Sequence, residues 1–165
     1  MSLILLSVGL IVTAIICPPC LLYFIVYVFL NIIYSAVLKH IPIVDIIVLS
    51  FGYIIRIYIG GEVAEVPISF WLIILTYALA LFILLAKRKD DVKDYLEKGV
   101  ISRTTVVFYS QLNFSFWLKL QAGFIIGIYT AYTLANSTKN MFNNDYIWLS
   151  VLPVAVGIFF IEIRF

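Results

Sequence analysis

Six apolar runs separated by short polar breaks make up most of this chain, and they limit the folds open to it. Hydrophobic residues account for 64% of the sequence and charged residues for only 12%, whereas ordinary soluble domains are about 25% charged. A single soluble core of 165 residues cannot bury so much apolar surface, so lipid must cover much of it. We therefore expect an all-α, polytopic integral membrane helix bundle with about six transmembrane helices.

The expected helices occupy residues 3–16, 21–38, 42–59, 68–86, 116–134 and 146–161. The first is short for a full span of about 20 residues, and no basic stretch precedes it, which argues against a cleaved signal peptide. Residues 87–105 interleave charges with Val92, Tyr95 and Leu96, a spacing that predicts an amphipathic cytoplasmic segment. We expect the whole chain, 1–165, to form one transmembrane domain.

Two cysteines, Cys17 and Cys20, enclose two prolines between the first and second apolar runs. This CxxC spacing also occurs in redox motifs, but no thioredoxin-like strand pattern surrounds it here. Consecutive prolines end one helix and start the next. We therefore favour a tight turn over a redox centre.

Basic residues concentrate in alternate connections between the runs. The second connection carries Lys39 and His40, the fourth carries Lys87, Arg88, Lys89, Lys93, Lys98 and Arg103, and the C-terminus carries Arg164. The first and third connections contain no Lys or Arg. By the positive-inside rule, both termini and the two basic loops are expected in the cytoplasm, at a bacterial-type plasma membrane. The net charge of +2 gives no indication of nucleic-acid binding.

The run 42–59 contains two ionisable residues, Asp45 and Arg56, which a helix places on nearly the same face with Gly52 between them. Such a stripe suits close helix packing or the lining of a cavity. For Asp45, a helix-dipole role in the first turn and a role in a site both stay open. For Arg56, we favour a structural ion pair near Glu62 or snorkelling to the outer side.

Residues 87–91 (KRKDD) bring three bases and two acids together where the fourth run ends. Bases can bind phosphates and carboxylates can bind Mg²⁺, while a solvated juxtamembrane cluster is the alternative. Lys39 and His40, taken alone, fit an interface anchor. If the bundle brings both clusters together, they form a pocket for a soluble diphosphate and a lipid. No Ser-His-Asp set, zinc-ligand spacing, Walker loop or GxGxxG motif is present.

Four segments of the sequence carry a family resemblance. They are residues 31–45 (NIIYSAVLKHIPIVD), 52–61 (GYIIRIYIGG), 66–72 (VPISFWL) and 86–91 (AKRKDD). Together they resemble the decaprenyl-phosphate phosphoribosyltransferase family, which belongs to the UbiA-type prenyltransferase superfamily. The resemblance is specific over about residues 31–91 and is weaker but collinear to the end of the chain.

The resemblance implies an all-helical, typically nine-helix membrane bundle. Its members transfer 5-phosphoribose from phosphoribosyl pyrophosphate to a polyprenyl phosphate, and they require Mg²⁺. It also implies two sets of site residues, namely phosphate-binding Lys39, His40, Lys87 and Arg88, and metal-holding Asp91 with Asp45 from the second acidic motif. No single catalytic residue is implied.

Two parts of the family pattern are absent from these residues, the first aspartate-rich motif and the closing helix with its Gly-Asp-Pro-Thr segment. We therefore expect the middle and later part of a larger enzyme, either inactive alone or completed by a separate chain that supplies the first motif. Two alternatives are kept. One is a UbiA-type prenyltransferase acting on another acceptor, and the other is a non-catalytic membrane subunit or remnant.

Overall fold

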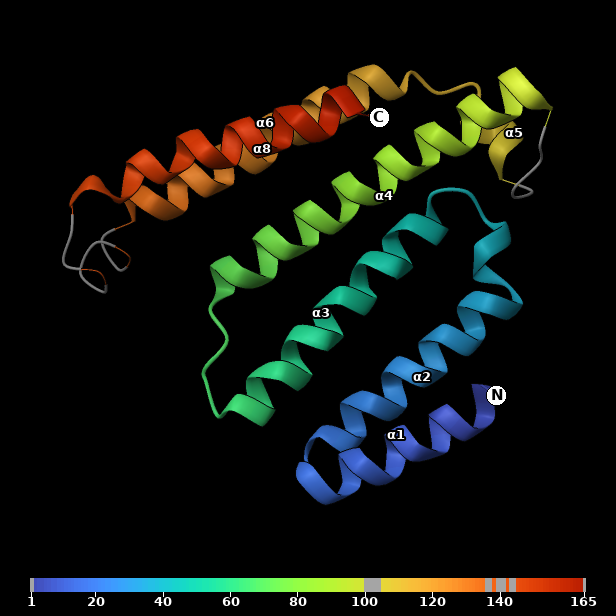
Figure 1. Ribbon diagram of the computed structural model, residues 1–165, viewed down its shortest axis with the longest axis vertical. Helices are drawn as coiled ribbons and strands as arrows, with labels where there is room; N and C mark the ends of the chain where they lie inside the picture. The colour runs from blue at the N-terminus through green and yellow to red at the C-terminus, as the bar shows by residue number, and fades with distance from the viewer. Residues whose placement is uncertain (1, 100–104, 136–137, 139–141, 143–144, 165) are drawn as a thin grey trace. The chain divides into compact units, whose positions relative to one another are not determined.

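The computed structural model describes residues 2–99, 105–135, 138, 142 and 145–164. These residues form helices, turns and short connections without a strand (Figure 1). The helices in chain order are α1 (Ser2–Ile16), α2 (Cys20–Ala36), the 3-10 helix η1 (Leu38–His40), α3 (Val44–Ala64), α4 (Phe70–Lys98), α5 (Val106–Tyr109), α6 (Phe114–Leu134), the 3-10 helix η2 (Asp145–Ser150) and α8 (Val151–Arg164).

The long helices follow the six expected runs, but two of them extend further than the apolar pattern predicts. Helix α3 continues through two glycines to Ala64, and α4 continues past Ala86 to Lys98. The first part of the expected amphipathic segment, residues 87–98, is therefore a continuation of α4. Residues 87–98 contain no Gly or Pro, and Gly99, with a φ of 67°, takes the left-handed conformation that ends helices.

The chain divides into two compact units, Met1–Tyr77 and Ala78–Phe165, with the boundary inside α4. In the first unit, α2 and α3 lie side by side as an antiparallel pair connected through η1 (Figure 1). Helix α1 packs on α2, and a Cβ atom added at Gly9 would lie only 3.2 Å from the ring of Phe24. This glycine therefore permits close approach of α1 to α2.

A disulfide between Cys17 and Cys20 closes the connection from α1 to α2. Pro18 and Pro19 form the turn, as the consecutive prolines predict. The cysteines are 9% and 0% exposed, whereas redox-active cysteines need an accessible sulfur. Their burial supports a structural turn over a redox centre.

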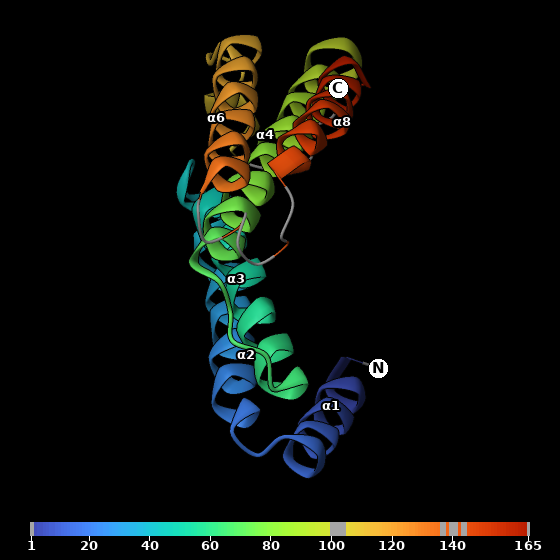
Figure 2. The same ribbon diagram turned by 90° about the vertical axis from the view of Figure 1, so that its left-hand side faces the viewer.

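The second unit contains α6, α8 and most of α4 (Figure 2). These three helices share an apolar core. Ala78, Phe82 and Ala86 recur every fourth residue along α4 and therefore share one face. Two of these three side chains are small, which lets α6 approach closely. Gln121 of α6 donates a hydrogen bond from Nε2 to the carbonyl oxygen of Ala78 over 3.1 Å. The other buried members of this core are Leu118, Ala122, Ile125 and Ile158.

Two of the described helices, α3 and α4, are long and apolar enough to cross a membrane. Helix α2 and the segment Tyr146–Glu162 are also apolar but shorter. All six expected apolar segments are thus largely helical, while the count of six spans stays a prediction.

Candidate functional site

An ion pair lies where the apolar part of α4 ends. Arg88 is 1% exposed and donates a hydrogen bond from Nη1 to Oδ2 of Asp91 over 2.8 Å, one turn further along the helix. Ala80 and Leu84 precede Arg88 at four-residue intervals and are also buried. Burial of a guanidinium is costly unless a carboxylate offsets its charge. Two residues expected in the site are therefore each other's partners.

The other charges near this ion pair differ in exposure. Lys87 is exposed, while Lys89 and Asp90 are half-buried. Further along α4, Lys98 donates a hydrogen bond to Asp94 over 2.6 Å. This hydrogen bond, with the charge of the carboxylate, raises the pKa of Lys98 above its ordinary value of 10.5. Lys98 therefore stays cationic at neutral pH. Lys87 is the exposed base among residues 87–91 and is open to a soluble phosphate.

Three expected site residues lie near the connection from α2 to α3. Lys39 and His40 belong to η1, with Lys39 half-buried and His40 exposed. Asp45 is fully buried in the first turn of α3, where a carboxylate interacts favourably with the positive end of the helix. These residues belong to the first unit. The charged residues 87–91 of α4, called the α4 cluster below, belong to the second unit. A joint pocket of the two clusters stays a prediction.

The carboxylates of the α4 cluster fit Mg²⁺ only in combination with other ligands. No group of three His, Cys, Asp or Glu side chains positioned to hold a metal occurs among the described residues. Asp91 is paired with Arg88, and Asp90 is its neighbour in sequence. Proteins often bind Mg²⁺ through one or two carboxylates together with substrate phosphates. The α4 carboxylates therefore suit an ion that is also held by a bound phosphate.

Arg56 lies inside α3 against two tyrosine rings. Its Cζ atom is 5.1 Å from the ring centroid of Tyr27 and 5.1 Å from that of Tyr53. It also donates a hydrogen bond from Nη2 to the hydroxyl oxygen of Tyr27. A charge at the centre of a span costs about 2.5–3.5 kcal/mol on insertion scales. A desolvated cation–π contact offsets about 2 kcal/mol or more of such a cost.

These contacts differ from the expected environment of Arg56. Within the described part of the chain, Arg56 forms no ion pair with Glu62. Six residues of helix rotate Glu62 to another side of α3, so the two side chains diverge. Tyr53 lies one turn toward the start of α3, and the guanidinium lies against its ring. Snorkelling of Arg56 to the outer side stays a prediction.

Gly52 is buried opposite the ring of Tyr27. A Cβ atom added there would lie 3.7 Å from that ring, an ordinary van der Waals distance, so the packing does not require a glycine. Asp45 and Gly52 are buried, whereas Arg56 is exposed. Gly52 and Arg56 both lie against Tyr27 and therefore share a face of α3, but the stripe is not buried along its whole length.

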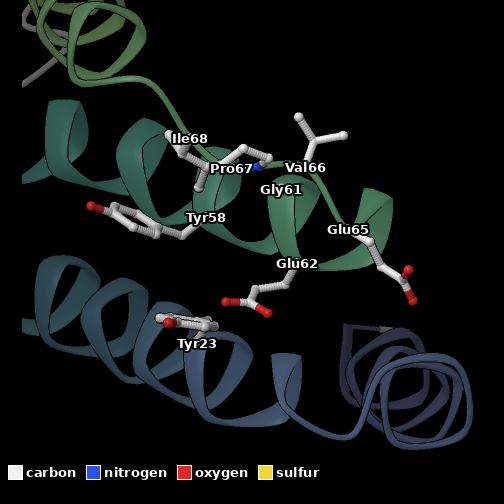
Figure 3. Close-up of a pocket in the computed structure, with 8 residues that line it drawn as sticks. All are labelled: Tyr23, Tyr58, Gly61, Glu62, Glu65, Val66, Pro67 and Ile68. Carbon is white, nitrogen blue, oxygen red and sulfur yellow. The ribbon is translucent and has the colours of Figure 1, made fainter.

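A cavity of about 470 Å³ opens at the end of α3, opposite the end that carries Asp45 (Figure 3). Tyr23 of α2 and Tyr58 of α3 stack there with ring centroids 6.0 Å apart and planes inclined by 20°. Glu62 extends from α3 toward α2, and Glu65 lies near the mouth (Figure 3). The sequence pattern predicted no site at these acids or at the tyrosines. The available signal was the four-residue spacing of Tyr23 and Tyr27, which places both on one face of α2.

Three curated relatives of this chain carry the name decaprenyl-phosphate phosphoribosyltransferase. The protein of Mycobacterium tuberculosis is 25% identical over 141 residues, which cover 86% of this chain and 46% of that protein. The Mycolicibacterium smegmatis protein is 26% identical over 139 residues, covering 81% and 44%. The Corynebacterium glutamicum protein is 24% identical over 133 residues, covering 81% and 40%.

The chain therefore spans less than half the length of these relatives. No family model matches the chain.

Proposed function

We propose that this chain is part of an integral membrane transferase of the UbiA-type superfamily, related to decaprenyl-phosphate phosphoribosyltransferases. The observation that carries the proposal is the 24–26% identity to three proteins of that name over 81–86% of the chain. Two apolar helices of spanning length support a membrane location. The distribution of Lys and Arg supports an orientation with both termini and the two basic connections in the cytoplasm.

The proposed reaction moves 5-phosphoribose from phosphoribosyl pyrophosphate to a polyprenyl phosphate. An oxygen of the lipid phosphate attacks the anomeric carbon of the ribose. The bond from that carbon to the diphosphate breaks, and diphosphate leaves with the bonding electrons. Positive side chains lower the barrier because negative charge develops on the departing group.

The proposed phosphate-binding residues are Lys39, His40, Lys87 and Arg88. Lys87 is exposed at the end of the apolar part of α4, which suits first contact with a soluble diphosphate. Arg88 is buried and also holds Asp91 in place. Mg²⁺ is proposed to neutralise the diphosphate, with Asp91, together with Asp45, as its ligands from this chain. The first aspartate-rich motif of the superfamily has to come from outside these residues.

The proposal is tested with membranes that contain the chain, produced with and without the reading frame directly upstream of its gene. These membranes are incubated with Mg²⁺, polyprenyl phosphate and labelled phosphoribosyl pyrophosphate. The expected result is labelled lipid that depends on added polyprenyl phosphate and is absent with the Asp91→Asn variant. No labelled lipid in either preparation would contradict the proposal.

A non-catalytic membrane subunit is the second candidate, because the described residues hold no three-ligand metal cluster. Binding of phosphoribosyl pyrophosphate without any turnover would favour this candidate. Prenyl transfer to another acceptor is a third possibility within the same superfamily. A panel of prenyl pyrophosphates, tested in the same membranes, separates it from phosphoribosyl transfer.

A further inference from the structure

Arg56 is a cation in the interior of an apolar helix, and the acidic residues of the chain all lie elsewhere. Asp45 is in the first turn of α3, and Glu62 is in its last turn. The other acids are Glu65 after α3, Asp90, Asp91, Asp94 and Glu97 beyond the apolar part of α4, Asp145 at the start of η2 and Glu162 near the end of α8. None of the nine acids in the sequence is therefore placed at the middle of an apolar helix.

The depth of Arg56 along α3 limits which anions can reach it. At a rise of 1.5 Å per residue, its Cα lies about 12 Å from the Ala64 end and about 18 Å from the Val44 end. Its guanidinium lies against Tyr53, which is one turn further from the Ala64 end. Lipid phosphates lie outside the hydrocarbon core, which is about 30 Å thick. With α3 spanning the core, as the proposed function has it, an anion that meets Arg56 is carried into the core by a membrane-spanning element.

The guanidinium of Arg56 has hydrogen-bonding capacity left for such an anion. Of its five N–H donors, one bonds an acceptor within the described part of the chain, the hydroxyl of Tyr27. The side chain is exposed, and two tyrosine rings restrict its position. A guanidinium held in this way is preorganised for a carboxylate, whose two oxygens match its donor geometry.

We propose that Arg56 is the docking residue for a transmembrane helix, from outside these 165 residues, that carries a carboxylate at the same depth. Charge complementarity selects this partner, because intramembrane charges pair with one another across helices. A second copy of the chain does not fit, because it brings another arginine and no acid to this depth. The proposal is independent of the transferase activity, since Arg56 has no role in the proposed phosphate site.

The test uses the full chain, labelled with a fluorescent donor, in phosphatidylcholine vesicles at pH 8. The probe is an acceptor-labelled leucine–alanine transmembrane peptide with one glutamate at its centre, and a matched peptide carries glutamine instead. Energy transfer measures association. We expect the affinity of the glutamate peptide for the chain to be at least about tenfold higher than that of the glutamine peptide. This factor corresponds to the difference in strength between a charged and a neutral hydrogen bond.

Three further arms make the result specific. Arg56→Met is expected to abolish the preference for glutamate, and it favours insertion because it removes a charge from a span. Lys119→Met, which removes an exposed cation near the start of α6, is expected to leave the preference unchanged. Moving the glutamate to the end of the peptide is expected to eliminate the preference, because the depths no longer match.

Three outcomes would overturn the proposal. The first is equal association of the glutamate and glutamine peptides with the unmodified chain. The second is a preference that persists in the Arg56→Met variant. The third is loss of the preference when phosphatidylglycerol is added at the same total lipid concentration, which would assign Arg56 to lipid headgroups.

Discussion

The Nη1 atom of Arg88 lies 2.8 Å from Oδ2 of Asp91, and the two side chains are 1% and 20% exposed. Removal of one partner from a buried pair costs far more than removal of one partner from an exposed pair, because it leaves a desolvated charge. Residues that are proposed to bind phosphate and metal therefore also form a partly buried ion pair within α4. Substitutions in this cluster need a stability measurement beside every activity measurement.

Asp91→Asn is expected to lower the free energy of unfolding by about 2–3 kcal/mol. This is at or below the lower end of the range for breaking a buried ion pair, about 3–5 kcal/mol, because Asp91 is partly exposed. Thermal unfolding in detergent, followed by circular dichroism, measures the change. Asp94→Asn is the matched control, since Asp94 and Lys98 form an exposed pair on the same helix. Equal unfolding temperatures for the two variants would show that the Arg88–Asp91 pair adds no more stability than the exposed Asp94–Lys98 pair.

Lys87→Gln is expected to weaken binding of phosphoribosyl pyrophosphate without lowering the unfolding temperature. Lys87 is exposed, so its loss leaves no buried charge, while a charged hydrogen bond to phosphate is worth about tenfold in affinity. Isothermal titration with the diphosphate substrate in detergent measures binding directly, and Lys93→Gln on the exposed side of the same helix serves as the control. The same affinity in both variants would remove Lys87 from the proposed site.

Gly61→Ala is expected to destabilise the end of α3 by about 1–2 kcal/mol, the range for overpacking. A Cβ atom at this position would lie 2.6 Å from Cγ1 of Ile68, whereas a Cβ at Gly60 would meet nothing within 4 Å. Gly60→Ala is therefore expected to be neutral or stabilising through helix propensity. The double variant Gly61→Ala, Ile68→Ala tests the cause, because loss of the clash should offset part of the effect of Gly61→Ala. Equal unfolding temperatures for the two single variants would contradict this account.

The helix positions could be predicted from the sequence because apolar runs of spanning length leave few alternatives. The end of α4 could not be predicted in this way, because hydropathy reports where lipid contact ends and not where helical hydrogen bonding ends. Residues 87–98 are charged but compatible with a helix, so α4 continues until Gly99. The two glycines near the end of α3 also led the sequence pattern to predict too early an end for this helix. Gly61 lies inside α3 and packs against Ile68.

The candidate site was predictable only as two local clusters. Lys39 and His40 stand together in sequence, as do Lys87, Arg88 and Asp91, but the distance between the clusters depends on long-range packing. The partners of Arg56 depend on the register between α2 and α3, which brings Tyr27 beside it. Sequence periodicity gives the face of each helix and leaves that register undetermined.

Cys17 and Cys20 are expected to be oxidised in the chain isolated from membranes without reductant. The structure joins them in a disulfide, and disulfides persist on the oxidising side of the membrane and are rare in the cytoplasm. The turn between α1 and α2 is also one of the two connections without Lys or Arg, which the charge pattern assigns to the outside. Alkylation with a maleimide reagent before and after reduction, read by mass spectrometry, measures the oxidation state.

Two modified cysteines only after reduction would agree with both the disulfide and the outward position of this turn. To test the outward position, the maleimide reagent and a membrane-impermeant reductant are added to whole cells before the membranes are isolated. Only thiols that can be reached from outside the cell then react. Cys20→Ser is expected to lose about 2 kcal/mol of stability, the chain-entropy value for so short a loop, and to free one thiol. Ready alkylation in unreduced membranes would contradict the disulfide and remove the support that it gives to this orientation.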